Sequence, residues 1–472
     1  MFTTPRAVLV GRFRYRVGVY YRGILVVSRI ANMFRVPDLR FKILFTLAML
    51  GLYRLGSFIP APGIDTLAVQ QLRESSEQQG GIIAYVQLFS GGGLTTFAIF
   101  ALGVLPYITA SIIMQVLGVV VPRIEQWQQQ GAVGQRKITQ WTRYLTIAIA
   151  VIQSTSFAFL FNRADGLGGG FVLLPRFNVF TVLLVVLTLT AGTALVMWMG
   201  ELITQRGIGN GMSLLIFASI VSQFPAQFST LWTNQGIAAV IAFAIILSIA
   251  LVGIVFVENG QRRIPVNFAK RVVGRKMYGG QSTYIPLKVN QSGVIPIIFA
   301  SSVLYLPNLI AVALPDTSWG NAVRNFVDRN LVDPTALLYI IVFGFMIVGF
   351  AYFYTAITFD PAKQADTIRK QGGFIPGIRP GPQTEHYLQR ILTRITLPGA
   401  LFIAAVALLP NLIMTAIGFD LDPGHGGGLG AAGFGFIGIS ILIAVGVALE
   451  TMKQIDSQLT MRNYEGFLAK KK

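Results

Sequence analysis

Two nine-residue segments of the chain repeat each other, and each carries aliphatic side chains at a spacing that suits a seal. Residues 103–111 read Gly-Val-Leu-Pro-Tyr-Ile-Thr-Ala-Ser and residues 293–301 read Gly-Val-Ile-Pro-Ile-Ile-Phe-Ala-Ser, so six of nine positions are identical. Val104 and Ile108 share one helical face, and the second copy repeats that spacing. Aliphatic constrictions in a pore exclude water and ions by dewetting. The alternatives are a chance match, or side chains that simply face lipid or neighbouring helices.

The chain has few residues that could carry out a reaction or bind a metal. The chain has 472 residues, of which 53% are hydrophobic and only 12% charged, against about 25% charged in soluble domains. It has no Cys, which excludes disulfides and thiolate metal sites, and its only His are His386 and His425. No HExxH pair or GxxxxGK loop occurs. Acidic residues avoid the middle of the apolar stretches, which disfavours ion-coupled transport and membrane enzymes. We therefore expect no catalytic residue, metal site or cofactor.

Ten apolar stretches are long enough, or nearly so, to cross a bilayer, which needs roughly 20 residues. They are residues 41–59, 97–121, 142–161, 178–199, 211–224, 237–257, 293–314, 336–359, 394–417 and 433–450. With the N-terminus in the cytoplasm, 32 of the 38 Lys and Arg fall on that side and 6 on the other. This asymmetry predicts a multi-pass membrane protein with both termini cytoplasmic.

Ten spans divide into two five-span halves, and the odd number makes the second half enter the membrane in the opposite sense. The two nonapeptides fall on the second span of each half. Matched, Gly/Pro-interrupted segments in inverted halves point to the working site of a duplicated membrane protein. The sequence therefore predicts an all-α membrane protein of ten transmembrane helices in two inverted halves around a central pore. A secondary solute transporter with inverted repeats is the alternative function.

Three connections stand out between these spans. Residues 60–96 are too polar to span; Asp65 can cap a short helix over 65–74, and the glycines after it allow hinging. The basic loops 258–292 and 360–393 are longer than orientation requires, and we expect both to fold into projecting hairpins. Such loops suit docking to an acidic protein or to ribosomal RNA, and the alternative is contact with anionic lipid.

The chain resembles the SecY family, the central channel subunits of the bacterial Sec protein translocase. The resemblance runs from about Arg35 to the C-terminus and rests on several motifs in order. They are residues 53–65, 100–111, 206–211, 257–263, 281–283, 286–290 and 377–381. Residues 1–26 have no counterpart in this family, so they are either a basic extension or an over-extended reading frame.

The resemblance implies a protein-conducting channel with a lateral gate, and it assigns roles to matching residues. The pore ring would be Val104, Ile108, Met212, Ile216, Ile298 and Ile443, of which Ile443 has the weakest match. The plug would include Asp65, Thr66, Leu67, Ala68, Val69 and Leu72. The lateral gate would include Ser111, Gln115, Ser302 and Asn308, although such polar residues also serve helix–helix hydrogen bonding. Motor and ribosome docking would use Arg262, Arg263, Lys270, Arg271 and Arg379.

The resemblance also implies partners and a location. The partners are SecE and SecG in a heterotrimer, the SecA ATPase, the ribosome, signal peptides and nascent chains, with YidC, SecDF and anionic lipids as further candidates. The location is the bacterial plasma (inner) membrane. The expected organisation is a basic cytoplasmic segment (1–40), a first half (41–224), a second half (237–450) and a basic cytoplasmic tail (451–472).

Overall fold

The computed structural model describes most of the chain, and the described part is mainly helical. It comprises residues 36–64, 89–94, 96–162, 178–268, 271–273, 276–278, 282–314, 317–332, 336–416 and 437–469. Each of the ten apolar stretches contains a helix: α2 Pro37–Gly56, α5 Leu105–Val120, α7 Ala132–Asn162, α8 Val179–Arg206, α9 Gly211–Val221, α10 Phe224–Asn259, α11 Ile295–Ala313, α13 Leu337–Thr358, α15 Pro382–Ala416 and α17 Ile437–Ala469.

Fewer of these helices pass a strict test for membrane spans, in which a helix must be both long and strongly apolar. Among the described residues six helical segments pass, and α5 adds a seventh if it is counted with the short helix α6 (Pro122–Gln129), which bends away from it by 99°. Helix α2 fails because Asp38, Arg40, Lys42 and Arg54 lie within its 20 residues. The structure therefore supports a helical protein with several membrane spans, and the count of ten is not established by this test.

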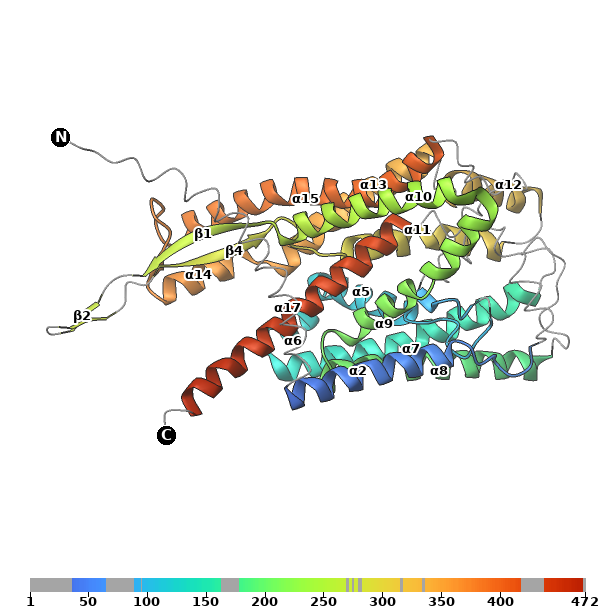
Figure 1. Cartoon of the computed structure of the whole chain (residues 1–472), viewed down its shortest axis with the longest axis horizontal. Helices are drawn as coiled ribbons and strands as arrows, with labels where there is room; N and C mark the ends of the chain where they lie inside the picture. Colours follow the sequence, from blue (N-terminus) through green and yellow to red (C-terminus); the bar gives the residue numbers. More distant parts are fainter. Residues whose placement is uncertain are drawn as a thin grey trace, which may run out of the picture.

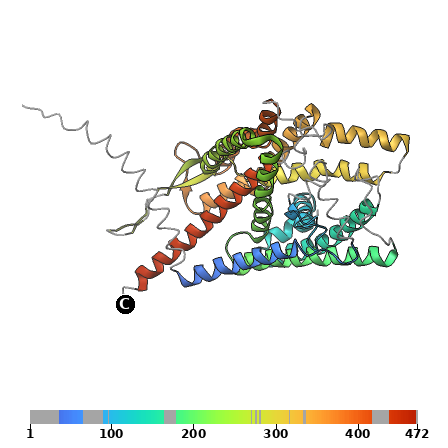
Figure 2. The ribbon, with the colours of Figure 1, turned by 45° about the vertical axis from the view of Figure 1, so that its right-hand side comes forward.

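The helices form two groups with a third set between them. Figure 1 shows α2, α7 and α8 along one side and α10, α13 and α15 along the other. Helices α5, α9 and α17 lie between these groups, and in the turned view of Figure 2 α5 lies between α8 and α11. The main apolar core draws residues from both groups and from the central helices.

The connection between the fifth and sixth expected spans is helical rather than a loop. Helix α10 begins at Phe224, before the expected span, and turns sharply at Gly236, where φ is +78°. Only glycine adopts this backbone region without steric cost, because any Cβ would clash with the backbone. The bend lets two helical segments follow each other without an intervening coil.

One small sheet joins the two basic loops. Strand β1 (Gln261–Phe268) pairs antiparallel with β4 (Ser282–Lys288), so the hairpin predicted for the first loop is confirmed. The strands β2 (Arg271–Val273) and β3 (Lys276–Tyr278) pair at its far end. For the second loop the prediction of a hairpin is wrong. It forms α14 (Pro361–Lys370) and the two-residue strand β5 (Gly373–Phe374), which pairs with β1.

The two loops pack on a common core. Their shared cluster contains Ile264, Val266, Leu287, Phe359, Ile368, Ile375, Leu388 and Leu392. Apolar residues from β1 and β4 thus meet those of α14 and the first turns of α15, which explains why the second loop has no independent fold. The result is one compact unit formed by the two basic loops, here called the loop module, which projects from the helices at the left of Figure 1.

Two further elements complete the described fold on the opposite side of the helices. Helix α12 (Ser318–Val327) and a π-helical segment, η1 (Asp328–Val332), connect α11 to α13. Arg324 of α12 donates hydrogen bonds to the carbonyls of Ala311 and Leu314 at 3.3 and 2.9 Å. These bonds add to the capping of the C-terminus of α11, where the Ala311 carbonyl also accepts from the Leu314 amide at 3.3 Å.

Candidate channel site

The two repeated segments have the same backbone conformation. Gly103 and Gly293 both have positive φ, +53° and +64°. The next residue has φ and ψ of −93° and −8° at Val104, and −91° and −6° at Val294, before helices α5 and α11 begin. Both helices carry Pro in their first turn, where the missing N–H would be unpaired anyway. The sequence repeat is therefore also a structural repeat.

The surroundings of the two segments differ. A Cβ at Gly103 would lie 2.5 Å from the Phe89 carbonyl oxygen and 2.8 Å from Ser90 Cα, whereas a Cβ at Gly293 would meet nothing within 4 Å. The first copy is thus packed tightly against residues 89–90. These residues directly follow the stretch 65–88, which contains all the expected plug residues and lies outside the described part of the structure.

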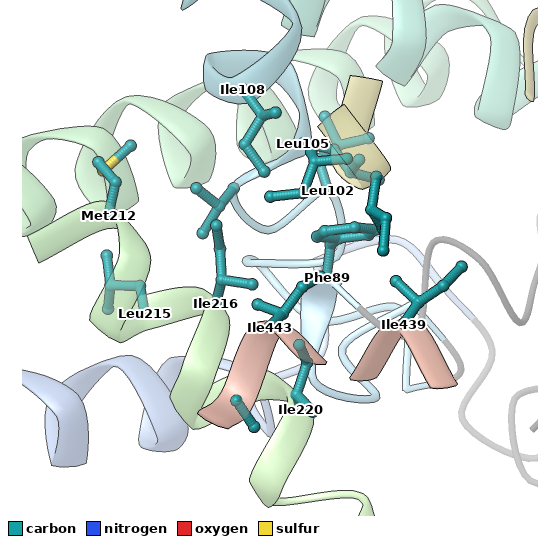
Figure 3. Packing of buried hydrophobic residues seen from close by; sticks show 14 of the residues in the cluster. Phe89, Leu102, Leu105, Ile108, Met212, Leu215, Ile216, Ile220, Ile439 and Ile443 are labelled. Atoms are coloured by element: carbon teal, nitrogen blue, oxygen red, sulfur yellow. The ribbon is translucent and has the colours of Figure 1, made fainter. Parts of the chain in front are cut away.

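The six expected ring residues belong to one apolar cluster. Their relative exposure is at most 8%, and they come from the start of α5, from α9, from α11 and from α17. Figure 3 shows Ile108, Met212, Ile216 and Ile443 approaching one another from three different chain segments. Helix α9 is positioned here by its cap, since the Asn210 side chain accepts hydrogen bonds from the amides of Met212 and Ser213 at 3.1 and 3.5 Å.

Many residues of this cluster were not selected by sequence analysis. Among those that Figure 3 labels are Phe89, Leu102, Leu105 and Ile439. Ile439 lies four residues before Ile443, so helical spacing alone could have indicated it. Phe89 had no such signal, because its position depends on tertiary contacts. The six expected ring residues are hydrocarbon side chains except for the thioether of Met212, and they offer no charged group to an ion.

The expected gate residues are only partly described. Gln115 Nε2 donates to Ser111 Oγ at 3.4 Å within α5, and Ser302 Oγ donates to the Ile298 carbonyl at 2.7 Å within α11. Gln115 Oε1 is buried and has no hydrogen-bond partner among the described residues. Asn308 lies in α11, but its side chain is outside the described set. Helix α5 packs on α7, α11 packs on α13, and α7 also contacts α11.

The chain segments that flank the expected plug are held together. The amide of Ala61 donates to the Phe97 carbonyl and that of Ile99 to the Ile59 carbonyl, both at 2.9 Å. Arg54 of α2 donates through Nη1 to the Gly91 carbonyl at 2.7 Å, and its guanidinium lies 5.1 Å from the centre of the Phe58 ring. The loop that contains the plug residues therefore starts and ends at one closed base.

Those expected docking residues that the structure describes lie on the loop module. Arg262 and Arg263 are exposed on β1, and the Arg263 guanidinium lies 4.8 Å from the centre of the Tyr284 ring of β4. Arg379 is exposed in the turn after β5, and the Thr384 hydroxyl donates to its carbonyl at 3.0 Å. Lys270 and the Arg271 side chain lie outside the described set.

Sequence analysis also missed an ion pair between two spans. Arg143 of α7 donates to both carboxylate oxygens of Glu201 in α8, at 2.7 and 2.5 Å. These residues are 58 positions apart, so no local pattern relates them. A bidentate pair of this kind fixes geometry as well as charge, and it joins the two helices.

Comparison with known proteins gives a consistent result. The SecY family model matches residues 98–452. A protein translocase subunit SecY from Mycobacterium bovis is 50% identical over 449 residues, which cover 94% of this chain and 100% of the relative. One from Streptomyces scabiei is 48% identical over 456 residues, with the same shares covered. The chain belongs to the SecY family.

Solved structures agree in fold with this SecY assignment. A protein-conducting channel aligns with a TM-score of 0.59 at 18% identity, covering 88% of this chain and 91% of the other. A SecY channel, described as having a plug domain that stabilises its closed state, gives 0.57 at 20% identity with the same coverage. A channel from a canine ribosome–channel complex of the endoplasmic reticulum gives 0.56 at 18%, again with that coverage. The SecY family thus accounts for the resemblance read from the motifs, and it does not support the solute-transporter alternative.

Proposed function

We propose that this chain is the protein-conducting channel of a Sec translocase. In this role it passes unfolded secretory proteins across the membrane and releases membrane-protein helices sideways into lipid. One observation carries the proposal: the two structurally equivalent repeats begin at a single aliphatic cluster to which α9 and α17 also contribute. A seal of this kind suits a substrate that is long, varied in sequence and not recognised by specific polar contacts.

In the proposed channel Val104, Ile108, Met212, Ile216, Ile298 and Ile443 form the pore ring. Their small, flexible or branched hydrocarbon groups can part around a passing chain and close after it. Because they offer no hydrogen-bond partner, water and ions that enter would lose their solvation, which is costly. Phe89, Leu102, Leu105 and Ile439 support this ring from the same cluster.

The segments next to the pore ring in sequence and space are the ones that we propose to move. We propose that Asp65, Thr66, Leu67, Ala68, Val69 and Leu72 belong to a plug that covers the ring. We further propose a lateral gate between α5 and α7 on one side and α11 and α13 on the other, with Ser111, Gln115, Ser302 and Asn308 along it. The contact between α7 and α11 supports this assignment, because it joins the two halves across the proposed exit.

The proposed topology is ten spans in two inverted halves in a bacterial plasma membrane, with both termini in the cytoplasm. It is supported by a helix in each of the ten apolar stretches and by the distribution of basic residues. It places the loop module, with the exposed Arg262, Arg263 and Arg379, on the cytoplasmic side together with the termini. We propose that Lys270 and Arg271 extend this basic surface.

The loop module is the proposed docking surface for the SecA ATPase and the ribosome, both of which can present acidic or phosphate groups. SecE and SecG are the proposed companion subunits in the membrane, and YidC, SecDF and anionic lipids are further candidate partners. The chain itself supplies no phosphate loop, so the energy for transport would come from such a motor or from translation.

The absence of Cys makes a direct test available. A crosslinker at Ile108→Cys or Ile298→Cys should capture a stalled secretory chain, because both side chains face the proposed path. Ile249→Cys in α10 is the control, since Ile249 is 69% exposed on the outside of the helices. Equal capture at all three positions would contradict the channel.

A further inference from the structure

Asn290 links three elements that the proposed function requires to work together. It follows strand β4 of the loop module and precedes α11, and its relative exposure is 6%. Its Nδ2 donates to the Glu258 carboxylate at the end of α10, at 3.0 Å, and to the Gly293 carbonyl, at 3.1 Å. Ser292 Oγ donates to Asn290 Oδ1 at 3.2 Å. The amide thereby uses both its donor and its acceptor side.

The chain around this amide is closely packed. The Val289 amide donates to the Gly260 carbonyl at 2.9 Å, which closes the base of the β1–β4 hairpin. A Cβ at Gly399 of α15 would lie 2.3 Å from the Val289 carbonyl oxygen, and a Cβ at Gly446 of α17 would lie 2.7 Å from Val294 Cγ1. These two glycines let α15 and α17 approach the joint so closely that the packed chain has little freedom to shift.

The joint lies between a docking surface and the seal. On one side the paired strands run outward from Gln261 and Lys288, which are cross-strand partners, to the exposed Arg262 and Arg263. On the other side α11 begins two residues after Gly293 and carries Ile298 in its first turn. Figure 1 shows the hairpin continuing directly from the end of α10.

We propose that Asn290 is a positioning residue that makes the β1–β4 hairpin and the first turn of α11 move as one body. A partner that displaces the hairpin then displaces Ile298 and the adjoining gate helix. The hydrogen bonds of Asn290 hold the hairpin and α11 together. Leaving this buried amide without its partners would cost more free energy than a small joint motion that keeps them. The inference rests on the proposed function, since it assigns the path from docking to opening.

The first test uses the otherwise native chain with its companion subunits in proteoliposomes. Spin labels at Tyr284→Cys on β4 and Val303→Cys on α11 report the hairpin-to-helix distance. Labels at Val151→Cys on α7 and Val303→Cys report the distance across the proposed gate. On addition of the motor ATPase and a stalled secretory chain, the second distance should change while the first stays constant. A change in the first distance equal to that in the second would overturn the proposal.

The second test uses variants of the joint. Asn290→Ala should lower motor-driven transport about tenfold, because it removes the three side-chain hydrogen bonds of the joint, while motor binding is unchanged. Glu258→Gln keeps an acceptor and should transport normally. Asn290→Asp sets two carboxylates against each other and should be impaired, and adding Glu258→Gln should restore much of its rate. Asn259→Ala is the matched control, because its exposed amide bonds only within α10.

The outcomes separate the coupling from the channel itself. If Asn290→Ala transports at the native rate, or if motor binding still changes the α7–α11 distance in that variant, the coupling role is wrong. If the native chain neither binds the motor nor transports, the proposed function fails instead. Equal loss in Asn290→Asp and in its Glu258→Gln double variant would indicate a packing role without the hydrogen-bonded coupling.

Discussion

The hydroxyl of Tyr53 lies 2.7 Å from the hydroxyl of Ser219, and both side chains are fully buried in the apolar core that contains the proposed seal. Tyr53 belongs to α2 and Ser219 to α9, so this polar contact joins the first and fifth expected spans. The Tyr53 ring also stacks on Phe100, with centroids 5.9 Å apart. Its hydroxyl further lies 3.5 Å from the carbonyl of Phe89, which is in the ring cluster. A hydrogen bond in such surroundings has no water to replace it.

Replacing Tyr53 with Phe should therefore loosen the seal without removing its packing. We expect a loss of about 1 kcal/mol in stability, because the ring remains and Ser219 keeps its bond to the Leu215 carbonyl. Thermal unfolding of the purified protein and ion leak through proteoliposomes measure the two effects. Tyr144→Phe is the control, since its exposed hydroxyl accepts only a surface bond from Gln140. Matching behaviour of the two variants would rule out a special role for Tyr53.

A polar group in the ring should admit water. Ile108→Asn or Ile298→Asn places an amide where the native cluster is hydrocarbon, and an unpaired buried amide costs about 1–3 kcal/mol unless water reaches it. We expect hydration of the constriction and a rise in ion conductance across planar bilayers. Ile113→Asn, at an exposed position on the same helix α5, is the control. Unchanged conductance in both ring variants would show that these residues do not form the seal.

The Arg143–Glu201 pair should contribute measurably to the packing of α7 on α8. Its side chains are 37% and 15% exposed, so solvent screens it partly, and we expect a coupling energy of about 1 kcal/mol in a double-mutant cycle. The variants are Arg143→Gln, Glu201→Gln and the double change, measured by thermal unfolding. The exposed pair Lys363–Asp360 is the comparison and should give almost no coupling. A coupling that is no larger for Arg143 than for Lys363 would contradict the prediction.

Charge reversal on the loop module should weaken docking. Arg263→Glu and Arg379→Glu each replace an exposed cation on the proposed surface, and we expect about tenfold weaker binding of ribosomes or of the motor at low salt. The difference should shrink as salt rises, because screening reduces exposed electrostatic attraction. Arg136→Glu in α7, exposed but outside the module, is the control. Equal weakening by all three changes would indicate a general charge effect instead.

The apolar helices could be predicted from the sequence because they depend on local composition. A run of about 20 apolar residues must satisfy its backbone internally in lipid, which demands a helix wherever the run occurs. The repeated nonapeptide was also informative, since Gly and Pro constrain the same backbone turn in both copies. The family motifs in turn predict a common role for Val104, Ile108 and Ile298, which the structure buries in one apolar cluster.

Long-range packing determined the remaining features. Ile443 had the weakest match by sequence, yet it is buried in the cluster with the other expected ring residues. The second basic loop folds only against the first, because its apolar residues need the surface of β1 and β4 to cover them. The pairs Arg143–Glu201, Tyr53–Ser219 and Asn290–Glu258 join residues 58, 166 and 32 positions apart. Sequence thus determined the apolar helices and their repeat, whereas tertiary structure decided which distant side chains meet, because such contacts depend on packing across the whole chain.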